Sequence, residues 1–160
     1  MDLDKYEQIR VGEKSEIIQT ITKESVQRFA ELTGDYNPLH MDDEFAIKKG
    51  FDGKIVHGML SASVSTMIAG MELPGHGSLL YSQSINYIAP AKIGDTLRII
   101  AEVVHKSVSL RVVLLKINTF NQKGRKLLSM KVKVRCPEKR RSVWKIIQKV
   151  LQLLQVQAGG

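Results

Sequence analysis

One segment without a charged residue limits the fold of this 160-residue chain more than any other feature. Residues 59–71 read Met-Leu-Ser-Ala-Ser-Val-Ser-Thr-Met-Ile-Ala-Gly-Met, so small and apolar side chains surround the whole helical wheel. A helix that has no polar face is normally buried inside a protein. We therefore expect one long helix that the rest of the chain covers.

After Gly77 the sequence changes to the alternating pattern of β-strands. Short turns around Pro90, Gly94 and Gly124 separate the strands, and short connections favour antiparallel pairing. The simplest way to bury the charge-free helix is an α+β hot-dog domain, in which a curved antiparallel sheet wraps around it. The strands expected after Gly77 are residues 79–89, 96–105, 108–120 and 126–135.

The first third of the chain predicts one strand, over 15–21, and two helices. Thr22 is a suitable N-cap for a helix that Gly34 ends, and residues 42–49 resemble a second, shorter helix. Residues 35–41 are expected to form a loop, because Pro38 pushes the residue before it out of the helical region. The apolar side of the first helix is expected to contain Val26, Phe29, Ala30 and Leu32.

Composition is that of a single soluble domain in a reducing compartment. The chain has one cysteine, Cys136, so it forms no internal disulfide, and a cytoplasmic location is expected. The first ten residues lack the apolar core of a secretory signal. No apolar stretch approaches the roughly 18 residues that span a membrane.

The net charge of +8 is concentrated near the C-terminus. From Gln122 onward there are eleven Lys and Arg residues and one acidic residue, which suggests either an anionic partner or a solvated basic face. We expect a main domain over 1–138 and a basic, amphipathic helical tail over 139–160. The tail has three open interpretations: packing on its own domain or a sister subunit, attachment to a membrane surface, or docking to a partner such as a synthase.

Two short motifs contain the residues best suited to chemistry. Asp35 and His40 lie five residues apart around Pro38, and Gly58 follows His57 where the charge-free helix begins. A carboxylate, an imidazole and the free N–H groups of a helix start can move protons beside a carbonyl group. From spacing alone, however, such an Asp-x-Asn-Pro-x-His loop is more often a simple turn. His57 itself is expected to make a structural hydrogen bond.

Other classes of site have little support. Four scattered histidines and one cysteine do not form a zinc pattern, and no glycine-rich nucleotide fingerprint is present. No helix-turn-helix segment is evident either. The expectation is therefore no metal, no separate cofactor and no nucleic-acid partner.

The run Phe29-Ala30-Glu31-Leu32-Thr33-Gly34-Asp35-Tyr36-Asn37-Pro38-Leu39-His40 resembles the signature of the MaoC-like, (R)-specific enoyl-CoA hydratases. The resemblance continues through Ile55-Val56-His57-Gly58-Met59-Leu60 and through Pro90 and Gly94-Asp95, and spans roughly residues 10–136. It implies a hot-dog homodimer, or a higher homo-oligomer, with sites near the subunit interface. It also implies an enzyme that reversibly hydrates trans-2-enoyl-CoA to (R)-3-hydroxyacyl-CoA.

The same resemblance assigns roles to individual residues. Asp35 and His40 match the catalytic pair that grips a water molecule, and which of the two takes the proton stays open. Gly58 matches the residue whose backbone N–H faces the thioester oxygen. Asn37 matches a family position that helps to order the loop or the substrate. Ser63 and Thr66 lie on the helix that follows Gly58, and we expect them to hydrogen-bond either His40 or polar atoms nearby.

Two alternatives remain at this point. The basic tail is compatible with a dehydratase that takes its substrate from an acyl carrier protein in place of CoA. A non-catalytic hot-dog domain that binds acyl-CoA is the second alternative, although such a domain has no use for the Asp35 and His40 pair.

Overall fold

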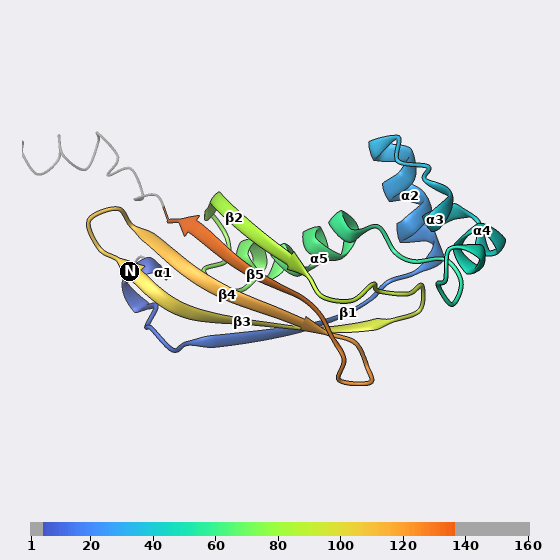
Figure 1. The fold of residues 1–160 in the computed structure, drawn as a ribbon. Coiled ribbons are helices and arrows are strands. Elements are labelled where there is room, and N and C mark those ends of the chain that lie inside the picture. Colours follow the sequence, from blue (N-terminus) through green and yellow to red (C-terminus); the bar gives the residue numbers. More distant parts are fainter. Residues whose placement is uncertain (1–4, 137–160) are drawn as a thin grey trace, which may run out of the picture.

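The computed structural model describes residues 5–136, which form an α+β domain with one curved antiparallel sheet beside a long helix (Figure 1). The five strands lie in the order β1-β3-β4-β5-β2. The strands are β1 (Lys14–Thr20), β2 (Leu79–Tyr87), β3 (Thr96–Ser107), β4 (Val112–Phe120) and β5 (Lys126–Arg135). The helices are α1 (Lys5–Gln8), α2 (Lys23–Thr33), α3 (Pro38–Met41), α4 (Asp43–Lys48) and α5 (Gly58–Met71).

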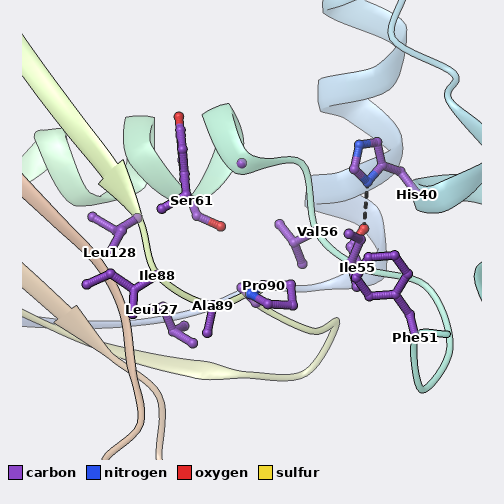
Figure 2. A pocket seen from close by; sticks show the side chains of 13 residues that line it. His40, Phe51, Ile55, Val56, Ser61, Ile88, Ala89, Pro90, Leu127 and Leu128 are labelled. Carbon is purple, nitrogen blue, oxygen red and sulfur yellow. Dashed lines mark hydrogen bonds between the residues drawn. The ribbon is translucent and has the colours of Figure 1, made fainter. Parts of the chain in front are cut away.

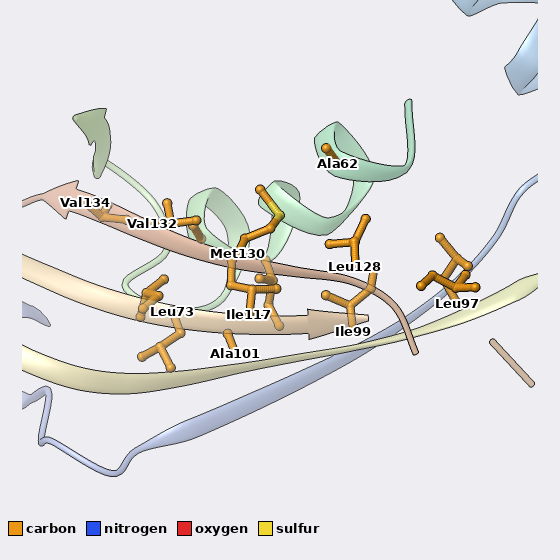
Figure 3. Close-up of a cluster of buried hydrophobic side chains, with 14 of the residues drawn as sticks. Ala62, Leu73, Leu97, Ile99, Ala101, Ile117, Leu128, Met130, Val132 and Val134 are labelled. Atoms are coloured by element: carbon orange, nitrogen blue, oxygen red, sulfur yellow. The ribbon is translucent and has the colours of Figure 1, made fainter. Parts of the chain in front are cut away.

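Alternate residues of the three central strands, β3, β4 and β5, build the core, as the period-two pattern predicts. Their side chains project from the sheet toward α5, which runs along its concave side (Figure 3). The hot-dog arrangement predicted from the sequence is confirmed. The fully buried strand residues include Leu97, Ile99, Ala101 and Val103 of β3, Val113, Leu115 and Ile117 of β4, and Leu128, Met130, Val132 and Val134 of β5.

Helix α5 is buried on one side only. Leu60, Ala62 and Ile68 face the core, whereas Met59 and Met67 are 52% and 41% exposed. The expectation that the chain covers the whole helix is therefore wrong for a single subunit, because the sheet reaches only one face. Figure 1 shows this geometry, with the sheet along one side of α5.

The ends of α2 form as predicted. Thr22 Oγ1 accepts a hydrogen bond from the Ser25 N–H at 3.0 Å, and Gly34 closes the helix in the left-handed region at φ 73°. Val26 and Ala30 are buried, but Leu32 is 84% exposed. The prediction that Leu32 belongs to the buried side is wrong, because α2 lies beyond the end of the sheet (Figure 1).

Two other predictions need correction. Residues 35–41 are not all loop, since Pro38 occupies the first turn of α3, where its missing N–H is not needed. Strand β4 starts at Val112, because residues 108–111 form the turn after β3, with Arg111 at φ 49°. Val108 and Leu110 are exposed there, so apolar residues alone did not mark a strand.

The predicted helical tail over 139–160 and its boundary with the main domain lie outside the described residues. Within residues 5–136, no helix is long and apolar enough to cross a membrane.

Candidate active site

The Asp35 loop is held in shape by its own side chains. Asp35 Oδ1 accepts the N–H of Asn37 at 3.2 Å, and Asn37 Oδ1 accepts the N–H of Leu39 at 3.0 Å, which caps α3. Pro38 restricts the backbone between these bonds. The predicted positioning role of Asn37 thus takes the form of loop ordering. These bonds connect the carboxylate to the start of the helix that carries His40.

The His40 imidazole is half-buried, and its Nδ1 lies 2.8 Å from the Ile55 carbonyl oxygen (Figure 2). A carbonyl oxygen can only accept, so Nδ1–H is the donor in this bond. In the neutral ring, Nε2 then has the free lone pair. The segment that carries the accepting carbonyl is also held in place, because the Ile55 N–H donates to the Leu39 carbonyl oxygen at 3.1 Å. His40 is therefore held with one nitrogen ready to accept a proton.

His57 brings the two halves of the site together. Its ring is 1% exposed, and its Nε2–H donates to the Asp35 backbone carbonyl at 2.9 Å, which confirms the structural hydrogen bond expected of it. The rings of His40 and His57 have centroids 3.9 Å apart and an interplanar angle of 35°. One ligand-type atom each from Asp35, His40 and His57 lies within 4.8 Å of the others. The predicted pair of Asp35 and His40 is thus brought together.

Gly58 is the first residue of α5, immediately after the N-cap His57. The first N–H groups of a helix have no partner within it, and they attract negative charge. A Cβ at Gly58 would lie 3.1 Å from the Tyr87 ring, closer than most such contacts. Glycine therefore leaves room at the helix start both for Tyr87 and for a bound molecule.

A cavity of about 320 Å³ joins His40 to the start of α5. His40 lies at one end of it, and apolar side chains such as Leu128 line the opposite end (Figure 2). An apolar cavity with a few polar groups suits a ligand with a hydrocarbon part and a reacting polar part. The lining consists of His40, Phe51, Ile55, Val56, Gly58, Ser61, Tyr87, Ile88, Ala89, Pro90, Ala91, Leu127 and Leu128.

Of the two kinds of partner expected for Ser63 and Thr66, the structure shows polar atoms nearby and not His40. Ser63 Oγ donates to the Leu60 carbonyl, and Thr66 Oγ1 donates to the Ala62 carbonyl, each within its own helix. Neither residue lines the cavity, whereas Ser61 does. Helical spacing could have predicted Ser61 as a lining residue, because it follows Gly58 by three residues and so lies on the same face of the helix.

The histidines and Asp35 suit proton transfer better than metal binding. His40 Nδ1 and His57 Nε2 each bond a carbonyl oxygen, so each ring has one nitrogen left. The remaining nitrogen of His57, Nδ1, is buried, and the two rings lie partly face to face. Ligands of a tetrahedral ion approach a single point from different directions. Within residues 5–136, the geometry therefore favours an acid/base pair over a metal centre.

Ion pairs hold the segment that follows α4. Asp43 accepts the backbone N–H of Lys54 at 2.9 Å and pairs with its ammonium at 3.2 Å. The backbone hydrogen bond first, and then the ammonium group, hold the pKa of Asp43 below its usual value. Asp52 pairs with Lys92 in the same region.

A second cavity, of about 590 Å³, shares the lining residue Pro90 with the first. It is more polar than the first, and Lys92, Lys123 and Arg125 are the basic residues that line it. Lys92 is paired with Asp52, whereas Lys123 and Arg125 are exposed. Asp52 and Asp95 are the acidic residues of the lining, so three basic residues against two acidic ones leave this recess with a net charge of +1.

Comparison with known proteins agrees with this geometry. Over 129 residues, which are 81% of this chain and 96% of the relative, the sequence is 33% identical to an (R)-specific enoyl-CoA hydratase of Aeromonas caviae. It is 37% identical over 98 residues to a 3-hydroxybutyryl-CoA dehydratase of Methylorubrum extorquens. The match spans 62% of that relative, which is less than two thirds of its length. That match covers 61% of this chain.

Solved structures give the same result. The unliganded R-hydratase of Pseudomonas aeruginosa superposes with a TM-score of 0.78 at 32% identity, over 84% of this chain and 86% of that one. Residues 8–119 match the family described as the MaoC like domain. The match covers more than half of the chain and includes the Asp35 loop, His40 and Gly58. The chain belongs to the MaoC-like dehydratase family.

Proposed function

We propose that the protein reversibly adds water to trans-2-enoyl-CoA thioesters to give (R)-3-hydroxyacyl-CoA. The observation that supports this most is that Asp35 lies close to His40, and that His40 and the start of α5 line one apolar cavity. Hydration needs a proton acceptor, a proton donor and a stabiliser for charge on the thioester oxygen. These residues have the chemistry for all three roles, and the named relatives include hydratases and a dehydratase.

The proposed reaction starts with a water molecule between the Asp35 carboxylate and His40 Nε2. Because Nδ1–H is bonded to Ile55, Nε2 takes a proton from the water, and the water oxygen forms a bond to C3 of the enoyl group. The C2–C3 π electrons move toward the thioester carbonyl to give an enolate. The acid/base pair then returns one proton to C2, so the pair ends the cycle in its starting state.

The N-terminal N–H groups of α5 stabilise the enolate in this proposal. Negative charge develops on the thioester oxygen only as the C3–O bond forms, so a donor placed there lowers the barrier more than it strengthens substrate binding. The Gly58 N–H is the proposed donor because it lies at the helix start and lines the cavity. The apolar lining around Leu128 then receives the acyl chain.

Product analysis tests the proposed function. Purified full-length protein and crotonyl-CoA should lose the enoyl absorbance, and chiral chromatography of the product should give (R)-3-hydroxybutyryl-CoA. An (S) product would contradict the proposed reaction. A protein that binds enoyl-CoA thioesters but leaves those of every tested chain length unchanged would support a non-catalytic acyl-CoA-binding domain.

The carrier is proposed to be CoA, whose phosphates would lie against the basic recess beside Pro90. Lys123→Ala and Arg125→Ala should each raise KM for crotonyl-CoA about threefold to tenfold, which corresponds to about 1 kcal/mol for a charged contact. KM for the crotonyl thioester of N-acetylcysteamine, which has no phosphate, should not change. Lys133→Ala, at an exposed position of β5, is the matched control.

Two outcomes would contradict CoA as the carrier. One is an unchanged KM for crotonyl-CoA in both recess variants. The other is a much higher kcat/KM for crotonyl-acyl carrier protein than for crotonyl-CoA in the wild type.

We also propose a homodimer formed through β2 and the exposed face of α5. Strand β2 is at the edge of the sheet, and Leu79, Leu80 and Tyr81 on it are exposed. An edge strand with exposed apolar residues is a site for pairing with another chain. A second copy fits best, because an antiparallel edge strand can pair with itself about a two-fold axis.

A further inference from the structure

His57 contacts all three parts of the candidate active site, although the proposed reaction gives it no chemical role. Its Nε2–H donates to the Asp35 carbonyl, and its ring lies against His40. Its backbone is the N-cap of α5, so Gly58 is the next residue. One residue thus connects the carboxylate loop, the imidazole and the helix start.

Packing alone does not explain a histidine at this position. The ring is 1% exposed and also packs against Phe29, with centroids 5.1 Å apart. Its Nδ1 is buried and has no hydrogen-bond partner among residues 5–136. Burying an unmatched acceptor costs free energy, and an apolar ring would fill the same space without that cost. The hydrogen bond that Nε2–H makes to Asp35 is the feature that an apolar ring lacks.

The two stacked rings hold their protons on opposite nitrogens. His40 donates through Nδ1 to Ile55, and His57 donates through Nε2 to Asp35, both to backbone carbonyls. A hydrogen bond therefore fixes the orientation of each ring, through Nδ1 in His40 and through Nε2 in His57. The distance between the Asp35 carboxylate and His40 depends on both anchors.

We infer that His57 is a positioning residue for hydration, which fixes the Asp35 loop relative to His40 and the Gly58 N–H. The inference rests on the proposed function, because the reaction defines which distances matter. Small displacements of reacting groups can lower a rate about 100-fold. Loss of this anchor should therefore lower kcat much more than it weakens substrate binding.

Two substitutions separate the anchor from the packing. His57→Gln places an amide N–H near the position of Nε2 and can keep the bond to Asp35, whereas His57→Phe keeps the ring and removes the donor. With crotonyl-CoA, His57→Phe should lower kcat about 10-fold to 100-fold with KM changed less than twofold. His57→Gln should recover kcat to within about fivefold of wild type.

Phe29→Leu is the matched control, because Phe29 packs against the His57 ring and does not line the cavity. It should lower Tm and leave kcat near the wild-type value. A His57→Phe variant with wild-type kcat would overturn the inference. So would equal losses in His57→Gln and His57→Phe, or losses of kcat that follow Tm across all three variants.

Nitrogen-15 NMR of the histidine rings tests the anchor without any turnover. The wild type should show His57 with its proton on Nε2 and His40 with its proton on Nδ1. His57→Phe should shift the backbone amide signals of Asp35 and Asn37, while His57→Gln should shift them less. If crotonyl-CoA is not a substrate but these signals behave as stated, the proposed reaction fails and the anchor stands. A His57 ring protonated on Nδ1 in the wild type would overturn the anchor itself.

Discussion

Gly58 shows how one missing side chain can shape the candidate site. A Cβ there would lie 3.1 Å from the Tyr87 ring, at the mouth of the helix that supplies the N–H donors. The backbone N–H would survive a change to alanine, so any loss would report on space and not on a missing donor. In the proposed reaction, the residue at this position controls how closely the thioester approaches the helix.

Gly58→Ala should lower kcat/KM for crotonyl-CoA at least about 10-fold, because either Tyr87 or the substrate must move. Gly70→Ala is the control, since it lies in the same helix with no atom within 4 Å of its new Cβ. That control should keep full activity and gain about 0.5–1 kcal/mol of stability from better helix propensity. Equal activities for the two variants would show that space at Gly58 does not matter.

The sequence was informative about residues in the loop and less so about residues on the helix. Asp35, Asn37 and His40 are close in sequence around a proline, so local geometry alone brings them near one another. Ser63 and Thr66 were placed by helix membership, but their hydroxyls bond carbonyls of the preceding turn. Which face of α5 meets the cavity depends on the sheet, and only the fold determines that.

At the level of elements, a short tether connects α4 to the segment that anchors His40. Asp43 at the start of α4 binds both the backbone N–H and the ammonium of Lys54, next to Ile55. Because the folded state holds the pKa of Asp43 below its usual value, its charge stabilises the fold above the unfolded pKa of about 3.9. This contribution disappears as the pH falls through the lowered folded pKa.

Asp43→Asn should therefore lower Tm at pH 7, and the difference from wild type should shrink as the pH falls below about 4. Thermal unfolding followed by circular dichroism across this pH range measures the effect. Glu44→Gln is the control, because Glu44 is an exposed neighbour that contacts only Lys48, at 3.9 Å, among the ion pairs described. A pH-independent difference for Asp43→Asn would contradict the charged tether.

Strands were easier to predict than the segments between them. The alternation in β3 and β5 fixed which residues are buried, because each faces the core on one side only. Residues 108–111 were predicted as strand because they include Val108 and Leu110 and contain neither glycine nor proline, although Arg111 makes the turn at φ 49°. The apolar residues of this segment suggested a strand, and nothing in the sequence indicated that Arg111 adopts the positive φ of a turn.

For the whole molecule, the exposed apolar residues on α5 and β2 are the basis of the proposed homodimer. Met67→Lys or Leu80→Lys should turn a dimer of the 18.0 kDa chain into a monomer, because burying a lysine there would cost more than the contact returns. Light scattering after size-exclusion chromatography measures the mass. Leu32→Lys, at an apolar residue 84% exposed on α2, should stay dimeric. A monomeric wild type would contradict the proposed interface.

The charge-free sequence of α5 predicted burial on all sides. Within a single subunit, however, only one face of α5 is buried. Sequence alone does not say whether the same chain or a second copy covers the other face. What covers the exposed face of α5 is therefore the part of the fold least accessible from the sequence.

The most direct test is the hydration rate of crotonyl-CoA in the wild type, in Asp35→Asn and in His40→Gln, with His105→Gln, at an exposed position of β3, as the control. Each of the two site variants should lose at least about 100-fold in kcat while its circular dichroism and Tm stay close to wild type. The His105 variant should keep full activity. Wild-type kcat in either Asp35→Asn or His40→Gln would contradict catalysis by this pair.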